Sequence, residues 1–380
     1  MRLARFELKC DVEDLTMKKI TLFYLAMVTL VLLPVSSFAV SNAAVIFLTI
    51  EPGSRSGAMG HSYVAQADDA FANWWNPAML AFNRKTQFAG MHSNWFGEVF
   101  DDMYYDYFAM SKYVEDVGNF GFSITYMTYG EQERTGEEQP DPGETPETFK
   151  SFDVSVAGTY AYQWKPDVGF GVTFKFIYSD LAPEGQGNTE NEVKGQGTSF
   201  AFDLGYAHKD IFVKNLDFGL NFQNFGPNIT YINESQSDPL PMNVKLGFSY
   251  TAVDHKYSKL TFNADMNKML ANRDNLFKRV FTAWGDDFTK DDFKSFDNFI
   301  NSTEIREVIL GFGAEYQYLN LLSVRAGYYA DRAGEITGPS FGGGIHRFIN
   351  DKYKLNVDFA MQPAGGLQDY NQTFTLRIEF

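Results

Sequence analysis

The feature that most constrains this chain is an alternation of apolar and polar residues with a period of two. In residues 170–179, "FGVTFKFIYS", aromatic and branched side chains fall on one face and small or polar ones on the other. Such alternation is typical of β-strands with one apolar face. We identify fourteen segments of about 10 to 16 residues, enough to cross a bilayer as strands. They lie at 86–96, 102–114, 117–130, 148–164, 167–180, 196–208, 215–225, 241–252, 257–268, 304–318, 321–331, 339–349, 353–362 and 371–380.

The connections between these segments alternate between short and long. The second, fourth and later even connections are mostly short, such as "KPD" and "LN". The odd connections are mostly long and include the acidic residues 131–149 and the segment 269–303. Up-and-down barrels of bacterial outer membranes have short periplasmic turns and longer external loops. The pattern therefore predicts such a barrel, with the N-terminal side of the first strand in the periplasm.

The period alone does not say which face points outward. Fourteen strands enclose more space than their own side chains readily fill, and frequent long aromatics suit a lipid face. Aromatics form 17% of the chain, including 37 Phe residues. We therefore predict an all-β transmembrane antiparallel barrel with a polar interior and Trp95, Tyr113, Trp164 and Tyr250 in interfacial girdles. The charged residues expected inside are Asp153, Lys175, Asp203, Lys245, Glu307, Glu315, Arg325, Asp358, Arg377 and Glu379.

The N-terminal region contains a candidate export signal. Residues 17–39 have Lys18 and Lys19, an apolar run, Pro34 and a Ser-Phe-Ala ending, which are the parts of a secretory signal peptide. A transmembrane anchor is the alternative. Residues 1–16, which contain Cys10, are interpreted as the product of a mis-called start codon. The remaining divisions are a periplasmic segment at 40–85 and an outer-membrane barrel at 86–380 with an external insertion at 269–303.

Composition and motifs argue against several functions. The net charge is −16 and no run of Lys and Arg stands out, so a nucleic-acid partner is not expected. The five histidines do not form a metal-binding spacing, and no nucleophile-elbow motif occurs. We therefore expect neither an enzyme nor a protein with a metal or cofactor.

Three stretches carry a resemblance to a known family. They are "EPGSRSGAMGHSYVAQADDAFANWWNPAML" at 51–80, "NFGPNITY" at 224–231 followed by "LPMNVKLGFSY" at 240–250, and the last strand ending in Phe380. The chain resembles the PorV/PorQ family of outer membrane proteins, within the FadL-like group of fourteen-stranded barrels. The resemblance spans nearly the whole chain after residue 39. His61 and Met79 depart from the usual motif.

The resemblance implies that residues 51–82 fold into the barrel mouth as a plug. Asp68 and Asp69 are then candidates to cap a short helix that Pro77 ends near Trp75. The tryptophans either pack the plug against the barrel wall or contact a ligand directly. The motif positions are Arg55, Gly57, Gly60, Asp68, Asp69, Trp74, Trp75, Asn76 and Pro77.

The C-terminal strand resembles the signal read by the barrel-assembly machinery. Its alternating apolar residues are Phe374, Leu376, Ile378 and Phe380. An ordinary last strand is the alternative.

Two external loops are candidates for partner binding. Residues 226–241 contain Asn228 and Tyr231. Segment 269–303 has apolar residues at helical spacings and predicts one or two short helices, which either bind a partner or form a lid on the barrel mouth. Its apolar residues are Leu270, Phe277, Val280, Phe281 and Trp284, followed by Phe293, Phe296 and Ile300.

The resemblance implies a role in protein export. PorV-like barrels act in type IX secretion as shuttles that hold the C-terminal domains of secreted proteins and pass them to a sortase. The alternatives are a FadL-like transporter of fatty acids or other hydrophobic molecules, with an apolar pocket near the plug and a lateral gap in the wall, and a porin-like barrel without a specific substrate. In each case the expected location is the bacterial outer membrane, in contact with lipid.

Overall fold

A computed structural model describes residues 43–380 except 134–147, 187–192, 233–236, 273, 285–288, 290–291, 350–351 and 367. Among the described residues, four short helices precede the barrel and four more lie between β9 and β10. The helices are η1 Ile46–Thr49, α2 Ser54–Gly57, α3 Ala72–Trp75, η2 Pro77–Phe82, α4 Leu276–Thr282, η4 Asp292–Lys294, α5 Phe296–Ile300 and α6 Thr303–Arg306. The strands are β1 Gln87–Asn94, β2 Met103–Val114, β3 Gly118–Glu133, β4 Thr148–Lys165, β5 Val168–Gln186, β6 Val193–His208, β7 Leu216–Phe225, β8 Asn243–His255, β9 Ser258–Met269, β10 Val308–Tyr318, β11 Leu322–Asp331, β12 Ile336–Ile349, β13 Tyr353–Pro363 and β14 Tyr370–Glu379.

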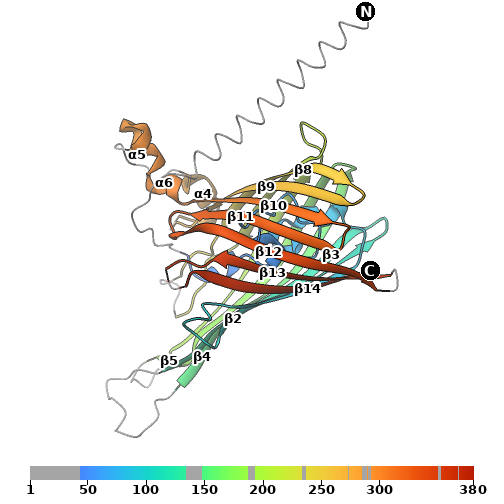
Figure 1. Ribbon diagram of the computed structural model, residues 1–380. Helices are drawn as coiled ribbons and strands as arrows, with labels where there is room; N and C mark the ends of the chain where they lie inside the picture. The colour runs from blue at the N-terminus through green and yellow to red at the C-terminus, as the bar shows by residue number, and fades with distance from the viewer. Residues whose placement is uncertain are drawn as a thin grey trace, which may run out of the picture. The chain divides into compact units, whose positions relative to one another are not determined.

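The fourteen strands form one closed antiparallel barrel, as the alternating pattern predicts (Figure 1). Each strand pairs with its neighbours in the sequence, and β1 closes the barrel by pairing with β14 from Gln87 opposite Glu379 to Ser93 opposite Thr373. Closure leaves no free strand edge, which is the condition for a sheet to cross a bilayer.

The two ends of the barrel differ, again as predicted. The connections β2–β3, β4–β5, β8–β9 and β10–β11 are tight turns at the end that holds the C-terminus. Helices α4, α5 and α6 belong to the β9–β10 connection at the opposite, external end (Figure 1). The insertion predicted at 269–303 therefore contains several short helices.

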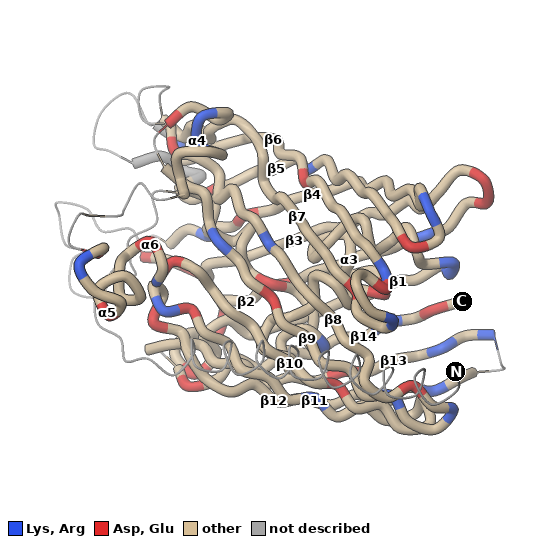
Figure 2. The backbone as a smooth tube through the Cα atoms, turned by 90° about the horizontal axis from the view of Figure 1, so that it is seen from above, with Lys and Arg blue, Asp and Glu red and all other residues tan. Residues whose placement is uncertain are grey.

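The polar face of the sheet points inward. Lys175, Asp203, Lys245, Glu315 and Asp358 are all buried. Large apolar residues of the same strands are exposed on the outer face, which is the arrangement of a membrane barrel. Figure 2 shows acidic and basic positions within the strands, between the two ends of the barrel, as well as in the loops.

The predicted aromatic girdle is only half right. Trp164 is exposed on the outer face, and Tyr250 has the outward parity of β8. Trp95 instead packs towards the interior beside Tyr105, with ring centroids 6.3 Å apart. Tyr113 has the inward parity of β2 and lies under the Arg84 guanidinium, 4.4 Å from the ring centroid. Both residues point to the side that the alternation along their strands dictates. Their position near a strand end does not reveal which side that is.

Three expectations concern residues outside the described part of the chain. These are the signal peptide at 17–39, the start at residues 1–16, and most of the acidic loop 131–149. Among the described residues, no helix is long and apolar enough to cross a membrane.

Candidate functional site

Residues 43–82, here called the N-terminal segment, lie inside the barrel. Nearly every residue from Glu51 to Ala81 is buried. The segment contacts inward-facing side chains on opposite sides of the wall: Ser54 bonds Thr375 of β14, and Asn221 of β7 donates to the Trp75 carbonyl. It therefore crosses the lumen and does not only line it.

Arg55 makes the principal ionic contact between the segment and the wall. Its Nε and Nη2 donate to the two carboxylate oxygens of Glu315 in β10, at 2.8 and 2.7 Å. Its Nη1 donates to the Tyr63 hydroxyl at 2.8 Å and also pairs with Asp68. Paired, hydrogen-bonded charges of this kind are the form in which Arg and Glu are found buried.

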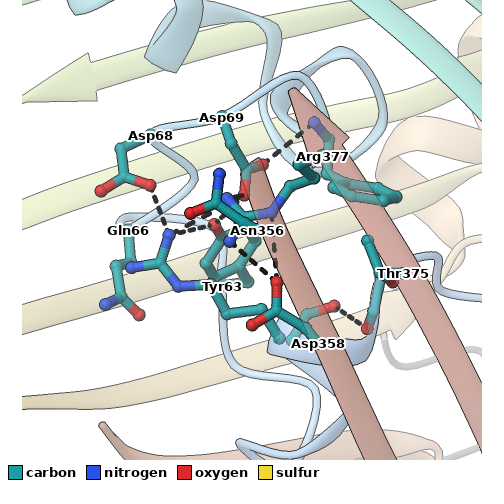
Figure 3. A network of polar contacts seen from close by, with 12 residues as sticks. Tyr63, Gln66, Asp68, Asp69, Asn356, Asp358, Thr375 and Arg377 are labelled. Atoms are coloured by element: carbon teal, nitrogen blue, oxygen red, sulfur yellow. Dashed lines mark hydrogen bonds and ion pairs between the residues drawn. The ribbon is translucent and has the colours of Figure 1, made fainter. Parts of the chain in front are cut away.

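The network continues through the wall to β14 (Figure 3). Arg325 of β11 binds both Glu315, at 2.6 Å, and Asp358 of β13, at 2.7 Å. Arg377 of β14 binds Asp358 at 2.9 Å and returns to the segment at Asp69, at 2.6 Å. Two carboxylates of the segment and two of the wall thus alternate with three arginines, so that each charged group has an opposite charge beside it.

Charge and burial set the protonation of the segment's own groups. Burial raises the pKa of Tyr63 well above its usual value, so this phenol stays protonated and donates to Asp69 at 2.9 Å. The nearby Arg55 charge lowers the pKa of Asp68, whose side chain is half exposed, to about 2. Asp68 is therefore an anion at neutral pH.

A second ionic contact lies around Glu51. Its carboxylate pairs with Lys245 of β8 and with His61, whose Nδ1 lies 2.6 Å away. The Lys245 ammonium also lies 4.8 and 4.9 Å from the ring centroids of Trp74 and Trp75. The tryptophans thus contribute cation–π contacts to a buried lysine.

The stretch from Trp74 to Pro77 is held by hydrogen bonds to its backbone and from its side chains. Asn221 and Gln223 of β7 donate to the Trp74 carbonyl, at 3.3 and 2.5 Å. Trp75 Nε1 donates to the Pro52 carbonyl at 2.8 Å. The contacts favour the packing interpretation of the two tryptophans over ligand contact.

The predicted helix end is correct and the predicted cap is only partly so. Helix α3 ends at Trp75, and the Asn76 side chain then caps η2 by accepting from the Ala78 amide at 3.1 Å. The N-cap position of α3 is Phe71, without a side-chain bond. Asp69 accepts from the Phe71 amide at 3.0 Å, whereas Asp68 pairs with Arg55 and caps nothing.

Glycines in the wall allow the segment to approach it backbone to backbone. A Cβ on Gly327 of β11 would lie 2.1 Å from the Gly60 nitrogen, and one on Gly171 of β5 would lie 2.3 Å from the Pro77 carbonyl carbon. Gly60 itself has φ +63°, and a Cβ there would lie 2.4 Å from the Tyr328 oxygen. The fit therefore requires glycine on both sides of the contact. Gly57 faces the flexible side chain of Gln362.

Little space remains between the segment and the wall. The cavity lined by Glu51, His61, Trp75, Lys245 and Asp265 has a volume of about 10 Å³. A cavity of that size holds about one water molecule. A larger pocket of about 410 Å³ opens at the end with the tight turns, and it is lined largely by charged residues, among them Asp68, Lys209, Lys354, Arg377 and Glu379.

The external candidate residues divide into two groups. Asn228 accepts a hydrogen bond from Arg279 of α4 at 3.1 Å, and the Tyr231 hydroxyl donates to Ser179 of β5 at 2.9 Å, so both help to hold loops together. The aromatic residues of the insertion, Phe277, Phe281 and Trp284, are exposed. Together with the exposed Phe293 and Phe296 of the same insertion, they remain available for an external contact.

The C-terminal residues lie on the outer face. Phe374, Leu376, Ile378 and Phe380 are exposed there. Phe380 stacks on Phe88 of β1, with centroids 5.9 Å apart, and bonds Thr86 through both backbone groups. The alternation is that of a lipid-facing strand, and recognition by the assembly machinery stays a prediction.

Sequence analysis missed three contacts of the segment. Asp265 of β9 accepts from the Tyr63 and Val64 amides, at 2.6 and 2.8 Å. Glu51 binds Lys245, and Tyr63 joins Arg55 to Asp69. A signal existed for Asp265, since it occupies an inward position of an alternating strand. Nothing in the local sequence marked Glu51 or Tyr63.

Comparison with solved structures supports the fold. The TodX monoaromatic hydrocarbon channel lacking S2 is 12% identical, with 87% of this chain and 98% of that chain covered and a TM-score of 0.52. The corresponding S2S3 deletion mutant gives 12% identity, 86% and 98% coverage and a TM-score of 0.50. A Pseudomonas aeruginosa FadL homologue is 10% identical over 86% of this chain and 98% of its own, with a TM-score of 0.45, which is too low to support the fold assignment. At such identities the likeness concerns the fold alone.

Sequence comparison identifies the family. A search of curated protein sequences gave no significant match. The family model described as "Type IX secretion system protein PorV" matches residues 36–275, which is more than half of the chain. The match includes the whole N-terminal segment and strands β1 to β9. This protein therefore belongs to the PorV family, and it is an outer-membrane β-barrel of FadL-like fold.

Proposed function

We propose that this protein acts in type IX secretion as an outer-membrane component that binds protein partners at its external end while its lumen stays closed. The observation that carries the proposal is the filled lumen. The N-terminal segment is held by two sets of buried ion pairs and by backbone contacts to wall glycines, and the cavity beside Trp75 has a volume of only about 10 Å³. The pocket of about 410 Å³ at the end with the tight turns reaches the segment at Arg55 and Asp69, and its lining is largely charged. We therefore infer that the barrel acts by binding protein partners at its external end.

The external insertion offers the best-supported binding surface. Phe293 and Phe296, on η4 and α5, are 66% and 75% exposed. The base of the insertion is fixed to the rim: Arg332 donates to the Ile300 carbonyl at 3.2 Å, and Lys268 of β9 pairs with Glu304 at 2.8 Å. Exposed aromatics on a fixed support suit recognition of an apolar partner surface. Secreted proteins with a common C-terminal domain, or the sortase that receives them, are the partners that the family suggests.

A transporter of hydrophobic molecules is the second candidate. The supporting observation is an apolar groove of about 560 Å³ on the outer face of β1, with Gly90 at its floor and Phe108, Phe374 and Leu376 beside it. Strand β1 pairs continuously with β14 and β2, which leaves no path from this groove through the wall. The pocket near the segment has a charged lining and does not extend the groove inward.

Affinity purification from the bacterium's own outer membrane tests the proposal. The tagged wild-type barrel is expected to retain secreted proteins or other secretion components in stoichiometric amounts by mass spectrometry. The F293S/F296S variant should lose them, whereas the matched exposed variant N298S should not. Bound hydrophobic small molecules without protein, in wild type and both variants alike, would favour the transporter instead.

A further inference from the structure

Helix α4 carries two apolar stripes that face in different directions. Leu276 and Val280, with Ala283 just after the helix, pack against Met242 and Leu270. Phe277, Phe281 and Trp284 follow at spacings of four and three residues and form a second stripe on the helix. These three aromatic side chains are 73%, 80% and 48% exposed.

The first stripe places α4 against the outer face of the barrel wall. The cluster that it joins includes Phe222 of β7 and Val244 of β8. Their neighbours Asn221 and Lys245 point inward to the N-terminal segment, so Phe222 and Val244 point outward. Helix α4 therefore lies on the side of the wall that faces lipid and not over the mouth of the barrel.

The second stripe is continuous with the lipid-facing surface. The Phe277 ring meets Phe225, the last residue of β7, with centroids 5.6 Å apart at an interplanar angle of 64°. Phe225 in turn lies beside Phe222, with centroids 5.8 Å apart. An unbroken series of aromatic rings thus leads from the outer face of β7 onto α4.

The length of β7 puts this junction at the edge of the hydrocarbon. Ten residues, at about 3.4 Å each and tilted by about 40°, rise about 26 Å, close to the apolar band of about 25 Å in such barrels. Strand β4 has 18 residues, and the same calculation makes it about 20 Å longer than β7 along the barrel axis. Figure 1 shows β4 and β5 extending beyond the other strands. The rim is therefore low at β7, where α4 lies.

Polar contacts fix the helix in this position. Arg279 donates to Asn228 and to the Asp274 carbonyl, at 3.1 and 3.0 Å. The Asn275 side chain caps the helix by accepting from the Lys278 amide, and Lys278 pairs with Asp274 at 2.7 Å. The exposed aromatic stripe is thus presented by a braced helix with a polar edge.

We propose that Phe277, Phe281 and Trp284 bind the lipid of the outer leaflet, so that α4 is an interfacial membrane anchor on the outside of the barrel. Aromatic side chains are favoured at the boundary between hydrocarbon and water, and a helix with one apolar and one polar side lies in that plane. The proposal does not depend on the partner-binding surface around Phe293 and Phe296. It assigns to lipid three residues that the sequence offered as partner contacts.

Site-directed spin labelling in dioleoylphosphatidylcholine liposomes tests the proposal. Phe281→Cys and Lys278→Cys are each labelled in a chain with Cys10→Ser, and folding is checked by the heat-dependent shift in gel mobility. The label at position 281 should show a ratio of oxygen to nickel-chelate collision rates several-fold higher than the label at 278. Equal ratios at the two positions would overturn the proposal. Shielding of position 281 from both reagents would also overturn it, because the stripe would then be covered by protein.

Discussion

Arg55 and Glu315 are joined by two hydrogen bonds, of 2.8 and 2.7 Å, although they lie 260 positions apart in the chain. One residue belongs to the N-terminal segment and the other to β10. The contact therefore ties the segment to a strand that is made late in synthesis, and the barrel has to assemble around it. Glu315 also binds Arg325, so the same carboxylate braces the wall.

Replacing Glu315 with Gln tests this contact. The variant leaves two buried guanidinium groups facing a neutral amide, and breaking a buried ion pair from one side costs about 3–5 kcal/mol. We expect a lower midpoint temperature for the heat-dependent gel shift of the folded barrel. The exposed variant Glu98→Gln is the control and should match wild type. An unchanged midpoint for E315Q would mean that the contact does not stabilise the fold.

The wall glycines give a sharper test, because the chain supplies its own control. In Gly327→Ala the new Cβ lies 2.2 Å from the Met59 backbone and 2.1 Å from the Gly60 backbone. Because the clash is with backbone atoms, no change of side-chain rotamer can relieve it. In Gly158→Ala the new Cβ has nothing within 4 Å. Overpacking a well-packed site typically costs about 1–3 kcal/mol, and occasionally more. We expect G327A to reduce the yield of folded barrel in the outer membrane and G158A to leave it unchanged; equal yields would show that the segment is not packed against β11.

Glu51 makes stability depend on pH. Burial acts to raise the pKa of Glu51, but Lys245 and His61 outweigh it, so the pKa lies below its usual 4.5. A carboxyl group whose pKa is depressed by folding stabilises the fold above its unfolded pKa, and this contribution disappears as the pH falls through the folded value. The variant Glu51→Gln should therefore melt below wild type at pH 7. The difference should shrink as the pH falls below 4.5. A difference that stays constant from pH 7 to pH 3 would rule out the ionised pair as its cause.

The sequence predicts the barrel well because strand parity is a local property. Alternation placed Lys245 and Asp358 inside without any knowledge of their partners. The prediction failed where strand ends were read by residue type instead of parity, as for Trp95 and Tyr113, which follow the inward parity of their strands. The helical spacing of Phe277, Val280, Phe281 and Trp284 likewise predicted a short helix within 269–303. It did not show which of two adjacent apolar stripes packs on the wall, since Val280 and Phe281 are equally apolar.

The contacts of the N-terminal segment were beyond sequence reasoning for a physical reason. Whether Arg55 reaches Glu315 depends on the register of several strands and on the path of the segment through the lumen, which are tertiary properties. Nor does the sequence around Gly311 or Gly327 reveal that the backbone at Gly60 approaches both of these glycines. Asp265 looked like any other inward carboxylate, although it holds two amides of the segment.

The central claim is that this barrel works from its outside while its lumen stays closed, and a locked segment tests it most directly. The Ser54 and Thr375 hydroxyl oxygens lie 2.8 Å apart, so Ser54→Cys with Thr375→Cys, in a chain with Cys10→Ser, offers a disulfide between the segment and β14. Secretion of type IX cargo into the medium is then measured in the bacterium with the disulfide formed and with it reduced. We predict equal secretion in the two states. Secretion that stops on oxidation and returns on reduction would show that the segment has to move, and would contradict the account.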